Sequence, residues 1–209
     1  MINNAQKLNS VQMLYDADLS QDSCGVGFIT RKDGKQTHDL LVKSHEALCT
    51  IPHRGGMSAE GIGDGAGVNI DISLKLFRKI TNLENLQLGQ FGVANFFFPE
   101  DHAHYDSSAK QLVEEHLKAF DLPVIKWRDV PVDKLVLNAA AIRAQLPIKQ
   151  LIFGRPAALK DASHDEFERY IQKALLAIEA DGFNRQELQG FYPLSMSSRT
   201  LVYKGRLNS

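Results

Sequence analysis

The 209-residue sequence predicts a protein that mixes helices with a sheet, of the α/β or α+β class. Short apolar or alternating runs, which are typical of β-strands, are interspersed with longer segments whose apolar residues recur at helical spacing. The composition is that of a folded chain, because 44% of the residues are hydrophobic, 23% are charged and the formal net charge is -1. We therefore expect one large domain, or at most two small ones.

In the first half of the chain, a polar leader is expected before a buried strand over residues 24–30. A turn is predicted at Asp33-Gly34. A helix is predicted to follow, with Thr37 as its N-cap, and to end at Pro52, because proline interrupts a helix. Residues 53–67 contain six of the 15 glycines and predict tight turns. The other elements expected in this half are strands over 68–72 and 91–98, with a short helix over 73–80 between them.

In the second half, Ser163 and Glu166 have the spacing of a capping box, and apolar residues follow at helical spacing from Phe167 to Ile178. This pattern predicts a helix that closes at Asp181-Gly182. Residues 130–147 give no clear prediction. The other expected elements are a helix from Asp106 or Ser107 to Phe120, strands over 124–127 and 151–153, and a hairpin of strands 192–197 and 200–203 around Ser198-Arg199.

Composition excludes several classes of function. A nearly neutral chain lacks the positive charge that nucleic acid or an anionic membrane would attract. No run of about 18 apolar residues predicts a transmembrane helix, and the first 20 residues lack the apolar core of a secretory signal. The two cysteines, Cys24 and Cys49, are too few for a disulfide scaffold, which favours a cytoplasmic location.

Cys24 is the residue best placed for chemistry. Gly25 and Gly27 follow it, so no adjacent side chain would obstruct a substrate that approached the thiol. A buried core cysteine fits the local sequence equally well, because free cysteine is among the most buried residue types.

Two other motifs give weaker signals. Gly61-Ile-Gly-Asp-Gly-Ala66 has a loose dinucleotide-binding form, but a predicted helix precedes it and a strand follows, the reverse of the required context. His45, Cys49 and His53 could share a helical face and bind zinc, but Pro52 should break that helix and a fourth ligand at conventional spacing is missing. No serine lies in a G-x-S-x-G elbow. We therefore predict no metal site.

Several segments, taken in order, resemble the amidotransferase domain of glutamate synthase large subunits, a class II (N-terminal-nucleophile) glutaminase. The segments that carry the resemblance are Leu14-Tyr-Asp16, Asp22-Ser-Cys24-Gly-Val-Gly-Phe28, His53-Arg-Gly-Gly56, Gly63-Asp-Gly-Ala-Gly67, Trp127-Arg-Asp-Val-Pro131 and Tyr203-Lys-Gly205. The resemblance implies an α+β fold, the N-terminal-nucleophile (Ntn) hydrolase αββα sandwich. It also implies a leader or propeptide over 1–23 and the N-terminal portion of the amidotransferase domain over 24–209.

The resemblance further implies a mechanism for hydrolysing glutamine. Removal of the leader would make Cys24 the N-terminal residue, and its thiol would attack the side-chain amide of glutamine. Ammonia would leave, and water would hydrolyse the thioester. An α-amino group has a pKa of about 7.7–8.0 and so suits the role of general base near neutral pH. By the same resemblance, we expect Gly25, His53, Arg54 and Gly55 to shape the pocket around Cys24.

Two sequence motifs of the family are missing. The glutamine-binding arginine lies in an Arg-Phe-Ser-Thr type motif and the oxyanion hole in a His-Asn-Gly-Glu type motif, yet neither Arg-Phe nor Asn-Gly occurs in this sequence. The domain is therefore expected to be C-terminally incomplete, and loss of one oxyanion donor alone typically lowers a rate by about 10²–10³-fold. We expect this chain by itself to show little or no glutaminase activity.

The resemblance also implies cofactors and partners. The whole enzyme would pass ammonia to 2-oxoglutarate with the help of FMN and an iron–sulfur cluster, neither of which this chain would bind. Its partners would be glutamine, the remainder of the large subunit and a small electron-transfer subunit. The alternative is a truncated or divergent, non-catalytic amidotransferase-like domain with a binding or regulatory role.

Overall fold

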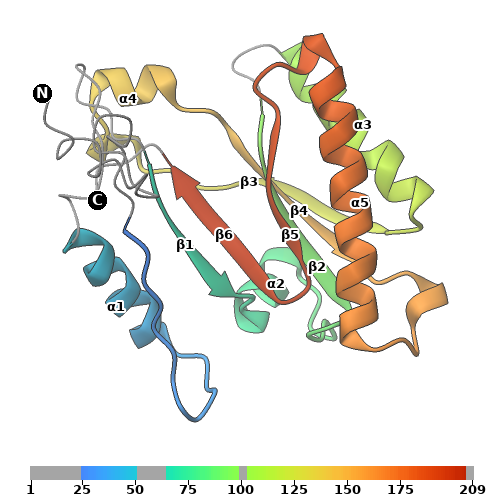
Figure 1. Ribbon diagram of the computed structural model, residues 1–209, viewed down its shortest axis with the longest axis horizontal. Helices are drawn as coiled ribbons and strands as arrows, with labels where there is room; N and C mark the ends of the chain where they lie inside the picture. The colour runs from blue at the N-terminus through green and yellow to red at the C-terminus, as the bar shows by residue number, and fades with distance from the viewer. Residues whose placement is uncertain (1–24, 51–64, 99–102, 206–209) are drawn as a thin grey trace, which may run out of the picture.

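The computed structural model describes residues 25–50, 65–98 and 103–205, and it confirms the mixed helix-and-sheet class (Figure 1). The helices are α1 (His38–Cys49), α2 (Leu74–Thr81), α3 (Ala103–Ala119), α4 (Ala139–Ala144) and α5 (His164–Asn184). The strands are β1 (Ala66–Asp71), β2 (Phe91–Phe97), β3 (Val124–Asp129), β4 (Ile148–Gly154), β5 (Tyr192–Ser197) and β6 (Thr200–Gly205). Short 3-10 helices are found at Lys134–Val136, Ala157–Leu159 and Gln186–Leu188.

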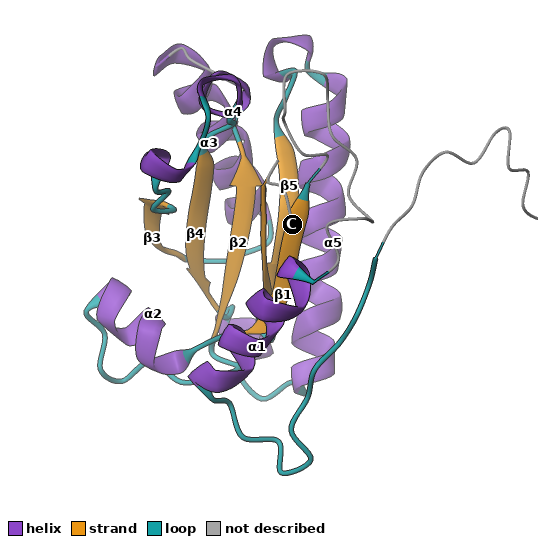
Figure 2. Ribbon diagram, turned by 90° about the vertical axis from the view of Figure 1, so that its left-hand side faces the viewer, coloured by secondary structure: helices purple, strands orange, loops and turns teal. Residues whose placement is uncertain are grey.

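Four strands form an antiparallel sheet in the order β3-β4-β2-β5, and α3 and α5 cover one of its faces (Figures 1 and 2). Successive side chains of a strand point to opposite faces, so alternate residues of β2 and β4 meet these helices. The resulting core is fully buried and rich in aromatic rings. Its members include Phe96, Phe98, Leu112, Phe153, Phe167 and Ile171.

The opposite face of this sheet carries α2 and a two-stranded antiparallel ribbon of β1 and β6 (Figure 2). A second core lies between them, formed by Ile72, Phe77, Leu86, Phe91, Val93, Ile152 and Leu201. Helix α1 lies on the outer side of β1 and contributes no buried residue (Figures 1 and 2). The ribbon is therefore held mainly through its contact with the larger sheet.

Helix α5 begins as the sequence predicts but ends later. Ser163 Oγ accepts a hydrogen bond from the Glu166 backbone N–H, and the Ser163 N–H donates to the Glu166 carboxylate, which confirms the capping box. The predicted end at Gly182 is wrong, because α5 continues to Asn184 and Gly182 is buried within it. A Cβ at Gly182 would lie 2.6 Å from the ring of Phe191, so this glycine allows close packing rather than helix termination.

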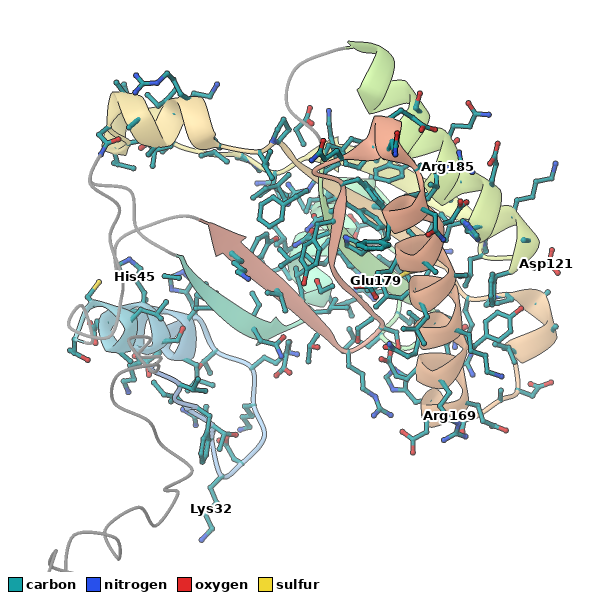
Figure 3. All side chains as sticks on the ribbon, turned by 45° about the horizontal axis from the view of Figure 1, so that its top comes forward. Lys32, His45, Asp121, Arg169, Glu179 and Arg185 are labelled. Carbon is teal, nitrogen blue, oxygen red and sulfur yellow. The ribbon has the colours of Figure 1, made fainter. Side chains whose placement is uncertain are left out.

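The strand predicted over residues 24–30 is not found in the described part, 25–30. This segment has no strand structure, and the side chains of Val26 and Phe28 are 96% and 91% exposed. The turn that follows carries Lys32 well away from the sheets (Figure 3). An apolar run becomes a buried strand only where a sheet edge and an apolar surface receive it, and no described strand pairs with these residues.

The hairpin predicted from strands 192–197 and 200–203 is wrong in its pairing, because β5 joins β2 in the four-stranded sheet while β6 pairs with β1 in the ribbon. The other predictions need only small changes. Helix α1 follows Thr37 as expected, although the Thr37 side chain makes no capping hydrogen bond. Strand β4 extends to Ile148–Gly154, beyond the three residues predicted, and α4 lies within the stretch that gave no clear prediction. In the part of the chain that the structure describes, no helix is both long and apolar enough to cross a membrane.

Candidate functional site

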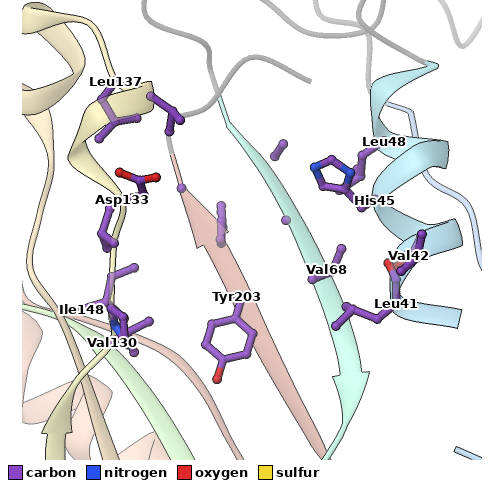
Figure 4. Close-up of a pocket in the computed structure, with 18 residues that line it drawn as sticks. Leu41, Val42, His45, Leu48, Val68, Val130, Asp133, Leu137, Ile148 and Tyr203 are labelled. Atoms are coloured by element: carbon purple, nitrogen blue, oxygen red, sulfur yellow. The ribbon is translucent and has the colours of Figure 1, made fainter. Parts of the chain in front are cut away.

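An open trough of about 610 Å³ lies above the β1–β6 ribbon (Figure 4). Helix α1 forms one wall, and residues 130–137 together with Ile148 form the other. Its lining is mostly apolar and includes Leu41, Leu48, Val68, Val130, Leu137 and Ile148, with His45, Asp133 and Tyr203 as polar members. The trough is therefore suited to apolar groups along its walls and to polar contacts at a few positions.

Three of the segments that resemble family landmarks meet at this trough. In the ribbon, Ala66 lies opposite Gly205, Gly67 opposite Lys204 and Val68 opposite Tyr203. The glycine-rich landmark and the Tyr203-Lys-Gly205 landmark are thus direct strand partners, although they are far apart in the sequence. Val130 and Pro131, from the third landmark, lie on the facing wall.

Glycine is required where the two landmark strands approach each other. Gly65 has a φ of +136°, a conformation that residues with side chains rarely adopt. A Cβ at Gly67 would lie 2.7 Å from the Tyr203 carbonyl oxygen and 3.2 Å from the Lys204 Cβ. The described end of this glycine-rich segment, 65–67, leads directly into β1, which begins at Ala66.

Several ionised side chains stabilise α5 on the far side of the four-stranded sheet from the trough. A hydrogen bond from Arg185 lowers the pKa of the Asp181 carboxyl, with a smaller contribution from His116. The Ser163 backbone N–H lowers the pKa of Glu166 in the capping box. These shifts support packing between helices and the start of α5, rather than chemistry in the trough.

Most of the predicted site residues lie outside the described part of the chain, namely Cys24, His53, Arg54 and Gly55. Gly25 is described and exposed. Their predicted roles, and the grouping of these residues around one pocket, stay predictions.

Metal binding gains no support from the described residues. Cys49 is exposed on α1 and has a free thiol. Within the described ranges, no group of three or more His, Cys, Asp or Glu side chains is placed to hold a metal ion. The third candidate ligand, His53, lies outside those ranges.

The sequence interpretation missed the polar side chains beneath the trough. Tyr203 accepts a hydrogen bond at its hydroxyl from the Gln150 side chain, and Gln150 also donates to Asn95. Both Gln150 and Asn95 are completely buried. A polar residue within or beside an apolar strand sequence could have indicated such a site, since Asn95 and Gln150 both have this setting. Only the register of the strands, however, brings Asn95, Gln150 and Tyr203 together.

The chain belongs to the class-II glutamine amidotransferases, whose family model matches residues 24–209. Among curated proteins it is similar to glutamate synthases. It is 31% identical to Glutamate synthase (NADH) of Saccharomyces cerevisiae, with 93% of this chain and 9% of that protein covered. It is 32% identical to the Glutamate synthase (NADPH) large chain of Bacillus subtilis, with 96% and 13% covered.

A third relative is Ferredoxin-dependent glutamate synthase 2 of Synechocystis, which is 35% identical over 90% of this chain and 12% of its own length. The chain thus spans about a tenth of the length of these relatives. The domain is that of a class II glutamine amidotransferase from the glutamate synthase family.

Proposed function

We propose that this chain is the glutaminase portion of a glutamate synthase and that it hydrolyses glutamine to glutamate and ammonia with Cys24 as nucleophile. In the whole enzyme the ammonia passes to 2-oxoglutarate. The observation that carries this function is the family match, which covers residues from Cys24 onward. The pairing of the two landmark strands at the trough gives it structural support.

The chemistry begins with removal of residues 1–23, which frees the α-amino group of Cys24. This amine accepts the thiol proton while Sγ attacks the amide carbon of the glutamine side chain. The carbon–nitrogen bond then breaks, the proton leaves with ammonia, and a thioester remains. Water adds to the thioester carbon and the carbon–sulfur bond breaks, which releases glutamate and restores the thiol. Gly25, His53, Arg54 and Gly55 shape the pocket in which these steps occur.

The fold inferred for this function is the Ntn-hydrolase αββα sandwich. Two observations support it, namely the helical layer of α3 and α5 on the four-stranded sheet and the ribbon with α1 beyond it on the opposite side (Figure 2). The domain is proposed to extend over residues 24–209, with its substrate-binding motifs missing from this sequence.

The redox cofactors are proposed to belong to other parts of the whole enzyme. An iron–sulfur cluster is held by about four cysteine thiolates, whereas this chain has only Cys24 and Cys49. We therefore place FMN and the cluster outside this chain, and we propose the remainder of the large subunit and a small electron-transfer subunit as partners. The low cysteine count also favours a cytoplasmic location.

The function is tested by ammonia release from glutamine and by intact mass. We expect the purified chain to lose residues 1–23 and to release ammonia slowly, because the oxyanion donors are missing. Cys24→Ser should remove the remaining activity. Cys49→Ser, which changes the other cysteine, is the matched control and should leave it unchanged. Ammonia release that survives Cys24→Ser would refute the assigned nucleophile.

A robust rate from the isolated chain would contradict the expectation of an incomplete site. Full activity in protein that still carries residues 1–23 would contradict the proposed role of the leader. The non-catalytic alternative gains no support from the relatives named above, which are glutamate synthases.

A further inference from the structure

A row of polar side chains crosses the whole four-stranded sheet beneath the ribbon. It contains one residue from each strand, in the order of the sheet: Arg128 in β3, Gln150 in β4, Asn95 in β2 and Ser195 in β5. Each residue lies directly opposite the next in the strand register. Because opposed residues of antiparallel strands point to the same face, the four side chains share the face that the ribbon covers.

Hydrogen bonds join this row from one edge of the sheet toward the other. Arg128 Nε donates to Gln150 Oε1 at 2.7 Å, and Gln150 Nε2 donates to Asn95 Oδ1 at 2.8 Å. The neighbouring residues of β2 and β4 on this face are apolar and include Phe91, Val93 and Ile152 in the second core. A buried amide without a partner is costly, so this row is stable only while its hydrogen bonds are made.

The row ends on the backbone of one residue in the ribbon. Asn95 Nδ2 donates to the Val202 carbonyl oxygen at 2.7 Å, and the Val202 N–H donates to Ser195 Oγ at 3.2 Å. Side chains of β2 and β5 thus form hydrogen bonds with both the N–H and the carbonyl oxygen of Val202, which face away from β1. They take the place of a neighbouring strand along this edge of β6.

These hydrogen bonds can form in only one register of β6 relative to the four-stranded sheet. Peptide groups of successive strand residues point to alternate sides. If β6 moved by one residue, the peptide groups of Leu201 or Tyr203 would replace those of Val202 and would point toward β1. Asn95 and Ser195 would then lose their partners, and the Gln150 bond to the Tyr203 hydroxyl would also be lost.

We propose that Asn95 and Gln150, with Ser195, form a latch that fixes the ribbon on the sheet and so positions Tyr203 in the trough. A two-stranded ribbon alone is marginally stable in water, so its placement depends on such attachments. The latch itself follows from these contacts, whereas any role of the trough in glutamine hydrolysis rests on the proposed function.

Hydrogen exchange of the purified 209-residue chain, followed by mass spectrometry, tests the latch. We expect Asn95→Leu to accelerate exchange in β1 and β6 by about 10-fold to 100-fold, the effect of leaving buried polar groups unpaired. Exchange in β3 and β4 should accelerate by a smaller factor, because their backbone hydrogen bonds to each other do not involve the ribbon. Emission from Trp127, the single tryptophan, should stay unchanged, because its ring packs on the other face of the sheet.

Asn69→Leu is the matched control. Asn69 lies opposite Val202 on the β1 side and is exposed, so the same substitution there should leave exchange unchanged. Ser195→Ala is a milder second variant, and it should accelerate exchange in β1 and β6 by a smaller factor. Equal exchange in Asn95→Leu and Asn69→Leu, or uniform acceleration of all strands in Ser195→Ala, would overturn the latch. No activity is measured, so such a failure would leave the role of Cys24 unaffected.

Discussion

Replacement of Gly67 by alanine should force apart the two strands beneath the trough. The added Cβ would lie 2.7 Å from the Tyr203 carbonyl oxygen, well inside ordinary contact distance, and the obstructing atom belongs to the backbone. The strands can relieve this contact only by moving apart, which weakens the β1–β6 hydrogen bonds. Overpacking of this kind costs about 1–3 kcal/mol. For a chain of this size, that loss corresponds to a decrease in Tm of about 2–12 °C.

Thermal unfolding followed by circular dichroism measures this effect directly. Gly27→Ala is the control, because a Cβ at Gly27 would have no atom of the described residues within 4 Å beyond its chain neighbours. We expect the control to keep the wild-type Tm to within about 1 °C, since it adds no contact in the folded chain. Equal Tm values for Gly67→Ala and Gly27→Ala would refute the argument that close strand approach requires glycine at position 67.

Two further predictions concern α5. Because Arg185 lowers the pKa of Asp181, the stability that this carboxylate contributes is present above its unfolded pKa of about 3.9 and is lost as pH falls through the lower folded value. Urea unfolding should therefore show a smaller loss of stability between pH 5 and pH 3 in Asp181→Asn than in the wild type, and an equal loss would contradict this assignment. Ser163→Ala should lower the free energy of unfolding by about 0.5–2 kcal/mol through loss of the cap. Lys160→Ala, outside the helix, is the control, and equal stability of the two variants would exclude the cap as a source of stability.

Local signals in the sequence predicted elements well. Helix α5 was predictable because its capping box and apolar spacing lie within the segment itself. Gly182 was misinterpreted, since a glycine near a helix end looks like a terminator and the ring of Phe191 that requires it lies outside the helix. The strand over 24–30 was wrong for a similar reason, because burial depends on a partner that the segment does not contain.

The candidate site was predictable only through resemblance. The local sequence did not distinguish a nucleophilic Cys24 from a buried core cysteine. The family match supports the class of enzyme, while the role of Cys24 stays a prediction. The pairing of Gly67 with Lys204 and the alignment of Asn95 with Gln150 depend on strand order and register. Neither can be read from spacing, because the partners come from distant parts of the chain.

The partnership of β1 with β6 has a consequence for synthesis of the protein. Ala66 pairs with Gly205, so β1 emerges from the ribosome 139 residues (205 minus 66) before its partner strand is complete. At about 5–20 residues per second, β1 waits roughly 7–28 s. Closure of so long a loop is also entropically unfavourable. Three strands of the larger sheet, β2, β4 and β3, are made during this interval, whereas β5 is made only just before β6. The nascent chain therefore carries β1 without its partner strand until β6 arrives, and an unpaired strand edge is prone to aggregation.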